Sequence, residues 1–462
     1  MNNEKCKWNS NLGFIFAAIG SAVGLGNIWS FPYKMSQGGG LIFIVTYLLL
    51  TFFVGVPLLV TELSLGRMSC SSVVGAYKRL SHKSTYIGWL SVLSSILVMT
   101  YYTALGGYCL RYFFINVKSF ILDQETISSE LLLDNCLRDI PTSVFFALLF
   151  IVFCYVILSK GISKGIEKFN IIVMPLLFIM LLISIGISLT FDGAVEGINN
   201  SFLKFDNNTN FFEVIINAGE QMFFSLSIAM GSMVTYGAYM SGGENIVKNS
   251  VIIAASDTLI AFMAALAVIP AAFSTHSGEN QDGPKLLFIT LQEVFSHFGR
   301  FGYLFCAMFF LLVIFAAVSS AVAIVEVPVS VIMESGFIER KVVIFFCCVL
   351  IFIPSIIITA DGMGVNGIAI PFADAFKSAK WNRSWLQFVT FISEGILMPI
   401  TALFTSVYIG WIKGPEIIIN EQKDNSLITH FFKKTFVFTI KFWVPIIVLL
   451  IIFGQIATFF SV

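Results

Sequence analysis

Long apolar segments recur along the whole chain, separated by short polar stretches. We count eleven that hold about 20 or more mostly apolar residues, at about 11–35, 40–66, 86–116, 142–160, 168–190, 214–240, 249–273, 301–332, 341–359, 385–411 and 436–460. A helix needs about 20 such residues to cross the hydrocarbon layer of a bilayer. The pattern therefore predicts an all-α membrane protein with eleven spans.

The first segment is interrupted where a spanning helix would continue. The stretch from Gly20 to Tyr33 reads GSAVGLGNIWSFPY and holds three glycines, an asparagine and a proline. Unpaired backbone groups in hydrocarbon cost several kcal/mol each, so an unwound helix at this depth must be buried in protein or hold a polar ligand. A binding site is one interpretation. A simple proline kink is the other, because glycine and proline are common in membrane helices.

The sixth segment repeats this anomaly. Between Glu220 and Gly231 it places small and polar residues in mid-span, at the position that corresponds to the first segment if spans 1–5 and 6–10 are two halves. Interrupted segments at matching places in two halves point to a transport site between inverted repeats. We expect a core over 11–411, with repeats at about 11–190 and 214–411, followed by an inner loop and an eleventh, peripheral span over 412–462.

Among the acids inside the apolar segments, Glu62 and Asp257 are the main candidates. An intramembrane acid is costly and is a functional candidate by default. Glu62 could serve function, but we prefer a structural role in which it accepts hydrogen bonds from the freed N–H groups of a broken helix. For Asp257 we expect a role in ion binding or in a polar network. The pair Ser319 and Ser320 could equally serve close helix packing.

Composition and charge support this class. Of the 462 residues 57% are hydrophobic and 12% charged, and the formal net charge is zero, which gives no sign of nucleic-acid binding. With the N-terminus inside, about sixteen of the 27 basic residues fall in inner loops, so we expect a multi-pass cell-membrane protein with a cytoplasmic N-terminus and an extracytoplasmic C-terminus.

The remaining chemistry is sparse. The eight cysteines lack metal-type spacing, and only Cys109 and Cys136 could meet in a disulfide on the outer side. The four histidines are scattered and no nucleotide-binding glycine loop is present, so an enzyme is not expected. The oligomeric state is open.

Taken in order, these motifs resemble the neurotransmitter:sodium symporters, especially the bacterial amino-acid transporters of the LeuT type. The resemblance covers nearly the whole chain and is carried by GSAVGLGNIWSFPY, SKGIEK, QMFFSLS, DTLIA, GPKLLFITL and AAVSSAVAI. It implies a 5+5 inverted-repeat bundle plus one C-terminal helix, with helices 1 and 6 unwound at mid-membrane. It also implies symport of sodium with an amino acid by alternating access.

The resemblance implies two sodium sites. The first would use Ala22, Asn27, Ser225 and Asp257, and the second would use Gly20, Val23, Ala316, Ser319 and Ser320. Sodium is a hard cation that prefers oxygen, and unwound carbonyls supply it.

It also implies a substrate site. The substrate carboxylate would meet the N–H groups near Leu25 and Gly26, where a helix begins. The full set implied is Ala22, Leu25, Gly26, Val98, Tyr102, Phe224, Ser225, Ser227, Met230, Ser320 and Ile324. Monoamine transporters of the family carry an aspartate where this chain has Gly24, so a substrate with a carboxylate is favoured. The implied pocket residues are apolar and leave room, so a hydrophobic or aromatic amino acid is expected.

Chloride is not expected to take part. Chloride-dependent relatives carry asparagine at the position of Asp257 and serine at that of Ala261. A fixed carboxylate beside a sodium ion can balance its charge directly.

The outer gate departs from the family. Ser30 and Thr390 stand where an arginine and an aspartate are usual, so we expect an outer gate closed by hydrogen bonds that include Gln221, and by Tyr102 against Phe224. A displaced pair between Lys34 and Glu394 is not expected, and Glu220 has no assigned role.

On the inner side, residues 1–10 resemble the family's N-terminal latch. The implied gate residues are Lys5, Trp8, Tyr239 and Glu334. An alternative function is a transporter-like sensor that binds an amino acid without net transport.

Overall fold

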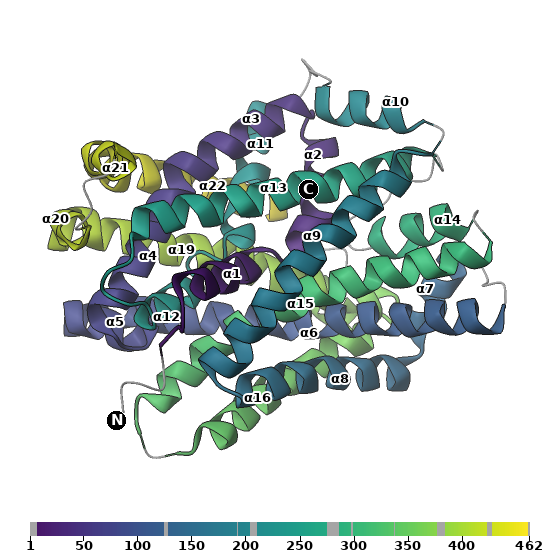
Figure 1. Cartoon of the computed structure of the whole chain (residues 1–462), viewed down its shortest axis with the longest axis horizontal. Coiled ribbons are helices and arrows are strands. Elements are labelled where there is room, and N and C mark those ends of the chain that lie inside the picture. Colours follow the sequence, from purple (N-terminus) through teal and green to yellow (C-terminus); the bar gives the residue numbers. More distant parts are fainter. Residues whose placement is uncertain are drawn as a thin grey trace.

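Helices make up the regular structure of the part of the chain that is described. The computed structural model describes residues 7–123, 128–191, 193–203, 210–274, 286–296, 299–336, 338–376, 384–422 and 427–460, and within them each element is helical. Most long helices run along the long axis of the molecule, with α5 and α20 near one end and α7 and α14 near the other (Figure 1). The predicted all-α class is confirmed.

Nine helical segments of the described residues are long and apolar enough to cross a membrane: Leu41–Ser69, His82–Leu122, Ile140–Ser159, Ile162–Ser188, Ile246–Phe273, Arg300–Met333, Arg340–Gly364, Trp385–Lys413 and Thr429–Phe459. Their principal helices are α3 (Leu41–Leu50) with α4 (Val56–Ser69), α6 (Thr85–Leu122), α8 (Ile140–Ser159), α9 (Lys168–Ser188), α13 (Ile246–Ser274), α15 (Arg300–Met333), α16 (Arg340–Asp361), α18 (Trp385–Thr390) with α19 (Met398–Val407), and α21 (Leu427–Phe438) with α22 (Val444–Phe460).

Two further segments are broken. α1 (Asn11–Ala22) is followed by η1 (Gly26–Ser30) and α2 (Phe31–Gln37), and the two parts are bent by 54°. α11 (Phe211–Ser225) and α12 (Ser232–Ala238) flank the second break, at residues 226–231. These are the two places where the sequence pattern predicts interruption. Counting the bent first pair as one span gives up to ten candidate spans in the described residues, so the number of eleven stays a prediction.

Short helices connect the spans. They are α5 (Val73–Leu80), α7 (Ser129–Arg138), α10 (Ala194–Ile198), α14 (Leu291–Ser296), α17 (Ile370–Phe376) and α20 (Glu416–Glu421). The N-terminus of α5 is capped by Ser72, whose side chain accepts from the Gly75 N–H.

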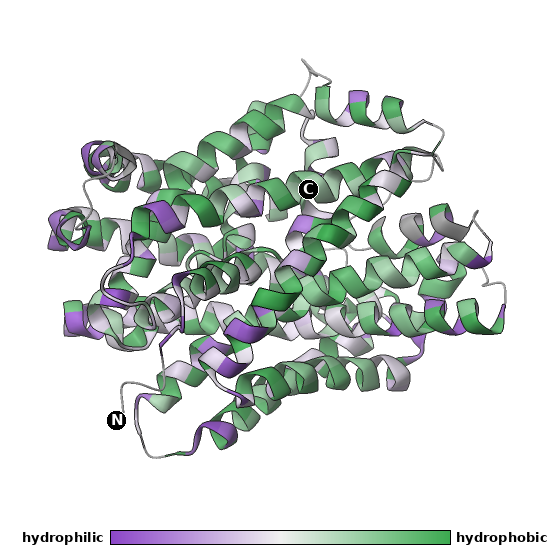
Figure 2. Ribbon diagram, viewed as in Figure 1, coloured by the Kyte–Doolittle hydropathy of each residue, from purple (hydrophilic) through white to green (hydrophobic). Residues whose placement is uncertain are grey.

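The centre and the periphery differ in burial. In its most apolar window α15 is 83% buried, whereas α8 is 33% and α9 39% buried. The outward faces of the peripheral helices are apolar, with exposed Ile172, Ile179 and Phe346, and Figure 2 shows hydrophobic colour along most of the long helices. Such a surface needs an apolar solvent, and a bilayer supplies one.

The broken first segment lies inside this bundle. α1 packs against α9, α13, α15 and α12, and its residues from Ala17 to Ala22 are buried. The second break therefore meets the first at the centre of the protein rather than at its lipid face.

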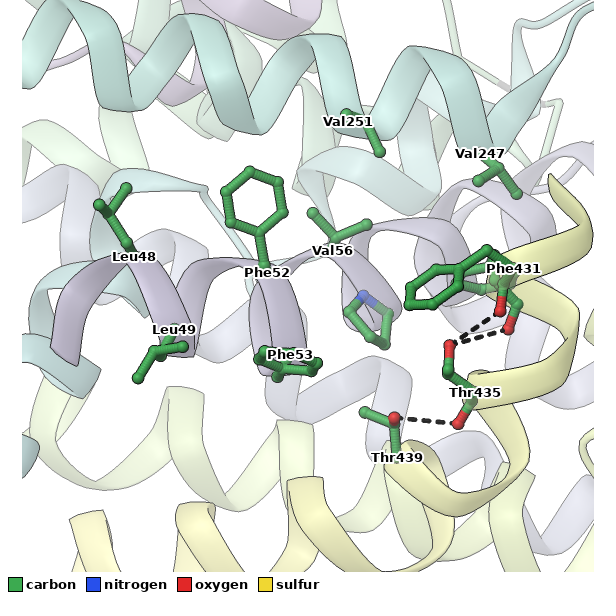
Figure 3. A pocket seen from close by; sticks show the side chains of 12 residues that line it. Leu48, Leu49, Phe52, Phe53, Val56, Val247, Val251, Phe431, Thr435 and Thr439 are labelled. Carbon is green, nitrogen blue, oxygen red and sulfur yellow. Dashed lines mark hydrogen bonds between the residues drawn. The ribbon is translucent and has the colours of Figure 1, made fainter. Parts of the chain in front are cut away.

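An apolar groove opens on the lipid-facing side between α3, α4, α13 and α21. Figure 3 shows Phe52, Phe53 and Phe431 lining it. The hydroxyls of Thr435 and Thr439 donate to carbonyls of their own helix, so they offer little to a polar ligand. This groove is separate from the breaks.

Two expectations need correction. Cys109 and Cys136 are both free thiols, so the disulfide prediction is wrong. Burial raises the pKa of the Cys136 thiol to about 11, which keeps it protonated at neutral pH. The eleventh segment is not peripheral throughout, because α22 packs against α11 and α19.

Candidate functional site

The break in the first segment exposes backbone groups that side chains satisfy. α1 ends at Ala22, and Val23 is extended, with φ −75° and ψ 103°. The Gly24 N–H donates to Asn27 Oδ1 at 3.1 Å, and the Leu25 N–H donates to the Tyr102 hydroxyl at 2.9 Å. The Leu25 N–H is one of the two groups, with that of Gly26, near which the substrate carboxylate is expected.

The second break holds strained backbone. Ser227 and Ala229 have positive φ angles of 51° and 68°, a conformation that costs about 1–3 kcal/mol for a non-glycine residue and is concentrated at functional sites. The Ala229 N–H donates to Glu62 Oε1 at 2.6 Å. The predicted structural role of Glu62, as acceptor for a freed N–H of a broken helix, is confirmed.

One carbonyl joins the two breaks. The hydroxyls of Ser227 and Ser320 both donate to the Ser21 carbonyl oxygen, at 2.7 Å and 3.0 Å. Ser21 lies in the last turn of α1, Ser227 in the second break and Ser320 in the continuous helix α15. The structure thus brings together residues of the predicted substrate site and of the second predicted sodium site.

The first predicted sodium site is assembled around a fully buried carboxylate. Asp257 accepts from Asn27 Nδ2 at 2.7 Å and from the Ser225 hydroxyl at 2.7 Å. The Tyr47 hydroxyl, which sequence reasoning missed, donates to the same carboxylate at 3.3 Å. These donors are uncharged, and a buried charge needs a charged partner. A monovalent cation fits this oxygen-rich place.

The second predicted sodium site lies between α1 and α15. The Ser319 hydroxyl donates to the Ala316 carbonyl at 2.9 Å. A Cβ atom at Gly20 would overlap Asn170 Oδ1 and would lie 3.3 Å from the Ser319 Cβ. Val23, the remaining residue of this set, is buried at the end of α1.

Asn170, on α9, is a polar residue of this region that sequence reasoning missed. It is fully buried, its Nδ2 donates to the Ile166 carbonyl at 2.9 Å, and its Oδ1 has no hydrogen-bond partner among the described residues. The carbonyl acceptor fixes the orientation of the amide, so the oxygen faces α1. An asparagine within the fifth apolar segment was the signal in the sequence.

The predicted substrate pocket is narrow at its glycines. A Cβ at Gly24 would lie 2.5 Å from the Tyr102 hydroxyl oxygen and 3.2 Å from Ser320 Oγ, and a Cβ at Gly26 would overlap the Phe224 ring. An aspartate at position 24 would not fit this arrangement. The predicted apolar lining is buried, with Val98 on α6, Met230 in the second break and Ile324 on α15.

The outer gate residues are only partly brought together. The Ser30 hydroxyl donates to Gln221 Oε1 at 2.7 Å, and Gln221 Nε2 donates to the Gly26 carbonyl at 3.1 Å. The Thr390 hydroxyl instead donates to the Leu386 carbonyl of its own helix. Phe224 lies over Gly26.

Charged residues flank this hydrogen-bonded layer. Lys34 Nζ lies 3.0 Å from Glu220 Oε2, so the two side chains form an ion pair. Glu220, which had no assigned role in the sequence analysis, therefore has a charged partner. Glu394 accepts from the Tyr101 hydroxyl.

On the inner side the predicted residues fall into two groups. Trp8 Nε1 donates to the Tyr236 carbonyl at 3.1 Å, and the Tyr239 hydroxyl donates to Glu326 Oε1 at 2.9 Å. Glu326, which sequence reasoning missed, also pairs with Arg340 at 2.6 Å.

Glu334 accepts hydrogen bonds from Ser71 and Ser72. Lys5 lies outside the described residues, so its pairing with Glu334 stays a prediction.

The chain is similar in sequence and in structure to known proteins. The sequence model of the "Sodium:neurotransmitter symporter family" matches residues 5–143 and 129–462. The chain is 29% identical to the "Uncharacterized sodium-dependent transporter YhdH" of Bacillus subtilis (strain 168), over 98% of each chain. It is 31% identical to the "Uncharacterized sodium-dependent transporter MJ1319" of Methanocaldococcus jannaschii, over 89% of this chain and 82% of that one.

A solved structure is similar over the same length. The crystal structure of MhsT in complex with L-phenylalanine has a TM-score of 0.86 to this chain at 30% identity, covering 97% of this chain and 99% of that one.

Glu62 gives a stability prediction. We expect Glu62→Ala to lower the stability of the protein by about 1–3 kcal/mol, because the buried Ala229 N–H loses its acceptor. The apparent melting temperature in detergent measures the effect. Glu62→Gln is the control, since its amide oxygen can still accept; an equal loss in both variants would contradict the assigned hydrogen bond.

Proposed function

The chain belongs to the sodium:neurotransmitter symporter family, and on that premise we propose that it imports a hydrophobic or aromatic L-amino acid together with two sodium ions by alternating access. The family consists of transporters, not enzymes, and the chain is a multi-pass membrane protein whose symport depends on sodium. The observation that carries the proposal is the meeting of two helix breaks, the second of them strained, around a buried carboxylate.

The chemistry of the breaks suits a zwitterion. The N–H groups of Leu25 and Gly26 lie at the start of the outer half of the first span, where the helix dipole favours a carboxylate. The Tyr102 hydroxyl accepts from the Leu25 N–H, and on substrate binding it would turn to donate to the carboxylate. The amino group would meet the Ala22 and Phe224 carbonyls and the Ser227 hydroxyl.

The pocket favours an apolar side chain. Val98, Met230 and Ile324 are buried apolar side chains, and Phe224 adds an aromatic ring beside Gly26. The crystal structure of MhsT, a structural neighbour, contains L-phenylalanine. These observations support a hydrophobic or aromatic amino acid for this chain.

Two sodium ions would act as cargo and coupling ions. The first would sit between the Asp257 carboxylate, Ser225, Asn27 and the Ala22 carbonyl. The second would be held by the Gly20, Val23 and Ala316 carbonyls with the hydroxyls of Ser319 and Ser320. Both sets offer oxygen atoms, which hard cations prefer.

The outer gate and the inner gate would close the site alternately. Ser30 and Gln221 would seal the outer side, with Thr390 on the facing span. Trp8 and Tyr239 would hold the inner side, together with Lys5 and Glu334. We place the N-terminus in the cytoplasm and the C-terminus outside, since most basic residues fall in the loops on the N-terminal side.

Uptake separates this proposal from the sensor alternative. Proteoliposomes with an inward sodium gradient should accumulate labelled L-phenylalanine, and excess leucine or tryptophan should compete while aspartate and lysine should not. Binding without accumulation would favour a sensor. No sodium dependence of either binding or uptake would sink the proposal.

Chloride gives a second prediction. Replacing chloride by gluconate should leave uptake unchanged, because Asp257 supplies the negative charge beside the first sodium ion. Asp257→Asn should abolish most uptake, and Asp257→Asn with Ala261→Ser should restore part of it only in chloride. The positions are one helical turn apart on α13, so the serine can face the same site. Chloride-dependent uptake by the unaltered protein would refute this.

Asn170 gives a third prediction. We expect its unpartnered Oδ1, beside Gly20 and Ser319, to strengthen the second sodium site. Asn170→Ala should raise the sodium concentration for half-maximal uptake about fivefold, corresponding to about 1 kcal/mol. Ser184→Ala on the same helix, whose hydroxyl bonds only to its own helix at Met180, is the control. An unchanged sodium dependence in Asn170→Ala would remove Asn170 from the site.

A further inference from the structure

Three residues from three helices meet at the outer end of the broken spans. Glu220 Oε2 receives Lys34 Nζ at 3.0 Å and Gln455 Nε2 at 2.9 Å. Lys34 lies on α2, the outer half of the first span, Glu220 on α11, the outer half of the sixth, and Gln455 on α22. One carboxylate oxygen therefore ties both outer half-helices to the last span.

The last span is built to approach α11 closely. A Cβ at Gly219 would overlap the Ile451 side chain, and a Cβ at Gly454 would overlap that of Ile216. Glycines at such contacts let two membrane helices come together. Gly219 directly precedes Glu220, and Gly454 directly precedes Gln455. The close contact of the two helices therefore brings the side chains of Glu220 and Gln455 within hydrogen-bond distance.

The same end of α22 also contacts the tenth span. The rings of Phe391 and Phe459 stack at 3.8 Å with an interplanar angle of 6°, and Gln455 Oε1 would lie 3.5 Å from a Cβ at Gly395. α22 thus bridges α11 and the tenth span. It is a continuous helix, whereas α11 ends at the second break and α2 is joined through η1 to the first.

Lys34 lies within electrostatic range of two acidic side chains. Lys34 and Glu220 side chains are each 15% exposed, so their attraction is less screened than that of a surface pair. Glu394, on the tenth span, is within electrostatic range of both Lys34 and Glu220. The positive charge of Lys34 therefore offsets the repulsion between Glu220 and Glu394.

We propose that Lys34 and Glu220 form an ionic lock that holds the outer gate closed, and that Gln455 of the last span is the residue that positions Glu220 for it. The lock lies one turn beyond Ser30, where the family's usual arginine is absent. It rests on the proposed alternating access. Its logic is mechanical: Glu220 on α11 holds α2 through Lys34 and α22 through Gln455, so an opening of the outer side that separates α2 or α22 from α11 must break a contact to that one oxygen.

Thiol labelling tests the lock without transport. Thr390→Cys, in the outer part of the tenth span, serves as reporter for a membrane-impermeant thiosulfonate reagent added outside. In sodium-containing buffer, Glu220→Gln and Lys34→Gln should each raise the labelling rate about threefold or more, since each removes the ion pair. The exchange Lys34→Glu with Glu220→Lys should return the rate toward that of the reporter alone.

Gln455→Leu tests the positioning role. It should raise the labelling rate less than Glu220→Gln does, and it should add little in a Glu220→Gln background, because both changes then affect one contact. Phe453→Leu, on the exposed face of the same helix, is the control and should leave the rate unchanged.

Three results would overturn the proposal: equal rates in the reporter and in Glu220→Gln, no recovery in the exchanged pair, or a rise in Glu394→Gln without one in Glu220→Gln. The last would make Glu394 the partner of Lys34 instead. Absence of sodium-driven uptake by the unaltered protein would sink the proposed function alone, since the labelling rates report the closure of the outer side directly.

Discussion

The structure depends on satisfying backbone groups where two helices stop inside the membrane layer. Lipid offers no hydrogen bonds, so each freed N–H or carbonyl must find a partner in protein or in cargo. The partners come mainly from unbroken spans: Glu62 for Ala229, Tyr102 for Leu25 and Ser320 for Ser21. The backbone groups freed at the breaks are therefore satisfied largely by side chains of neighbouring spans.

Two buried acids show how differently one residue type is used here. Glu62 accepts from one backbone N–H, while its second oxygen has no partner among the described residues. Asp257 accepts from three side chains, contributed by the first, second and sixth spans. Glu62 thus stabilises the second break alone. Asp257 gathers both breaks and an unbroken helix around one carboxylate, which is the arrangement expected of the proposed first sodium site.

The sequence pattern predicted features that depend on local composition. Apolar segments of spanning length, glycines and a proline inside one of them, and an acid in another are visible without knowing the fold, so the spans, the two breaks and the role of Glu62 could be predicted. Tyr47 and Gln455 were missed because each is an ordinary residue in an apolar helix until its partner on another span is known. Asn170 was visible as an asparagine in an apolar segment, but its place beside Gly20 follows only from the fold. The disulfide failed for the same reason, because sharing the outer side of the membrane does not bring two thiols into bonding distance.

The two ends of the transport path share one construction. On the outer side α2 and α11 are joined by Lys34 and Glu220 and tied to the unbroken α22 by Gln455. On the inner side Trp8, just before α1, bonds to Tyr236 of α12, and Tyr239 at the end of α12 bonds to Glu326 of the unbroken α15, which Arg340 neutralises. Each end thus links two half-helices to each other and then to a continuous helix. Because the half-helices of one span are separated by a break in the helix, releasing one tie need not release the other. Opening at one end with closure at the other is what alternating access requires.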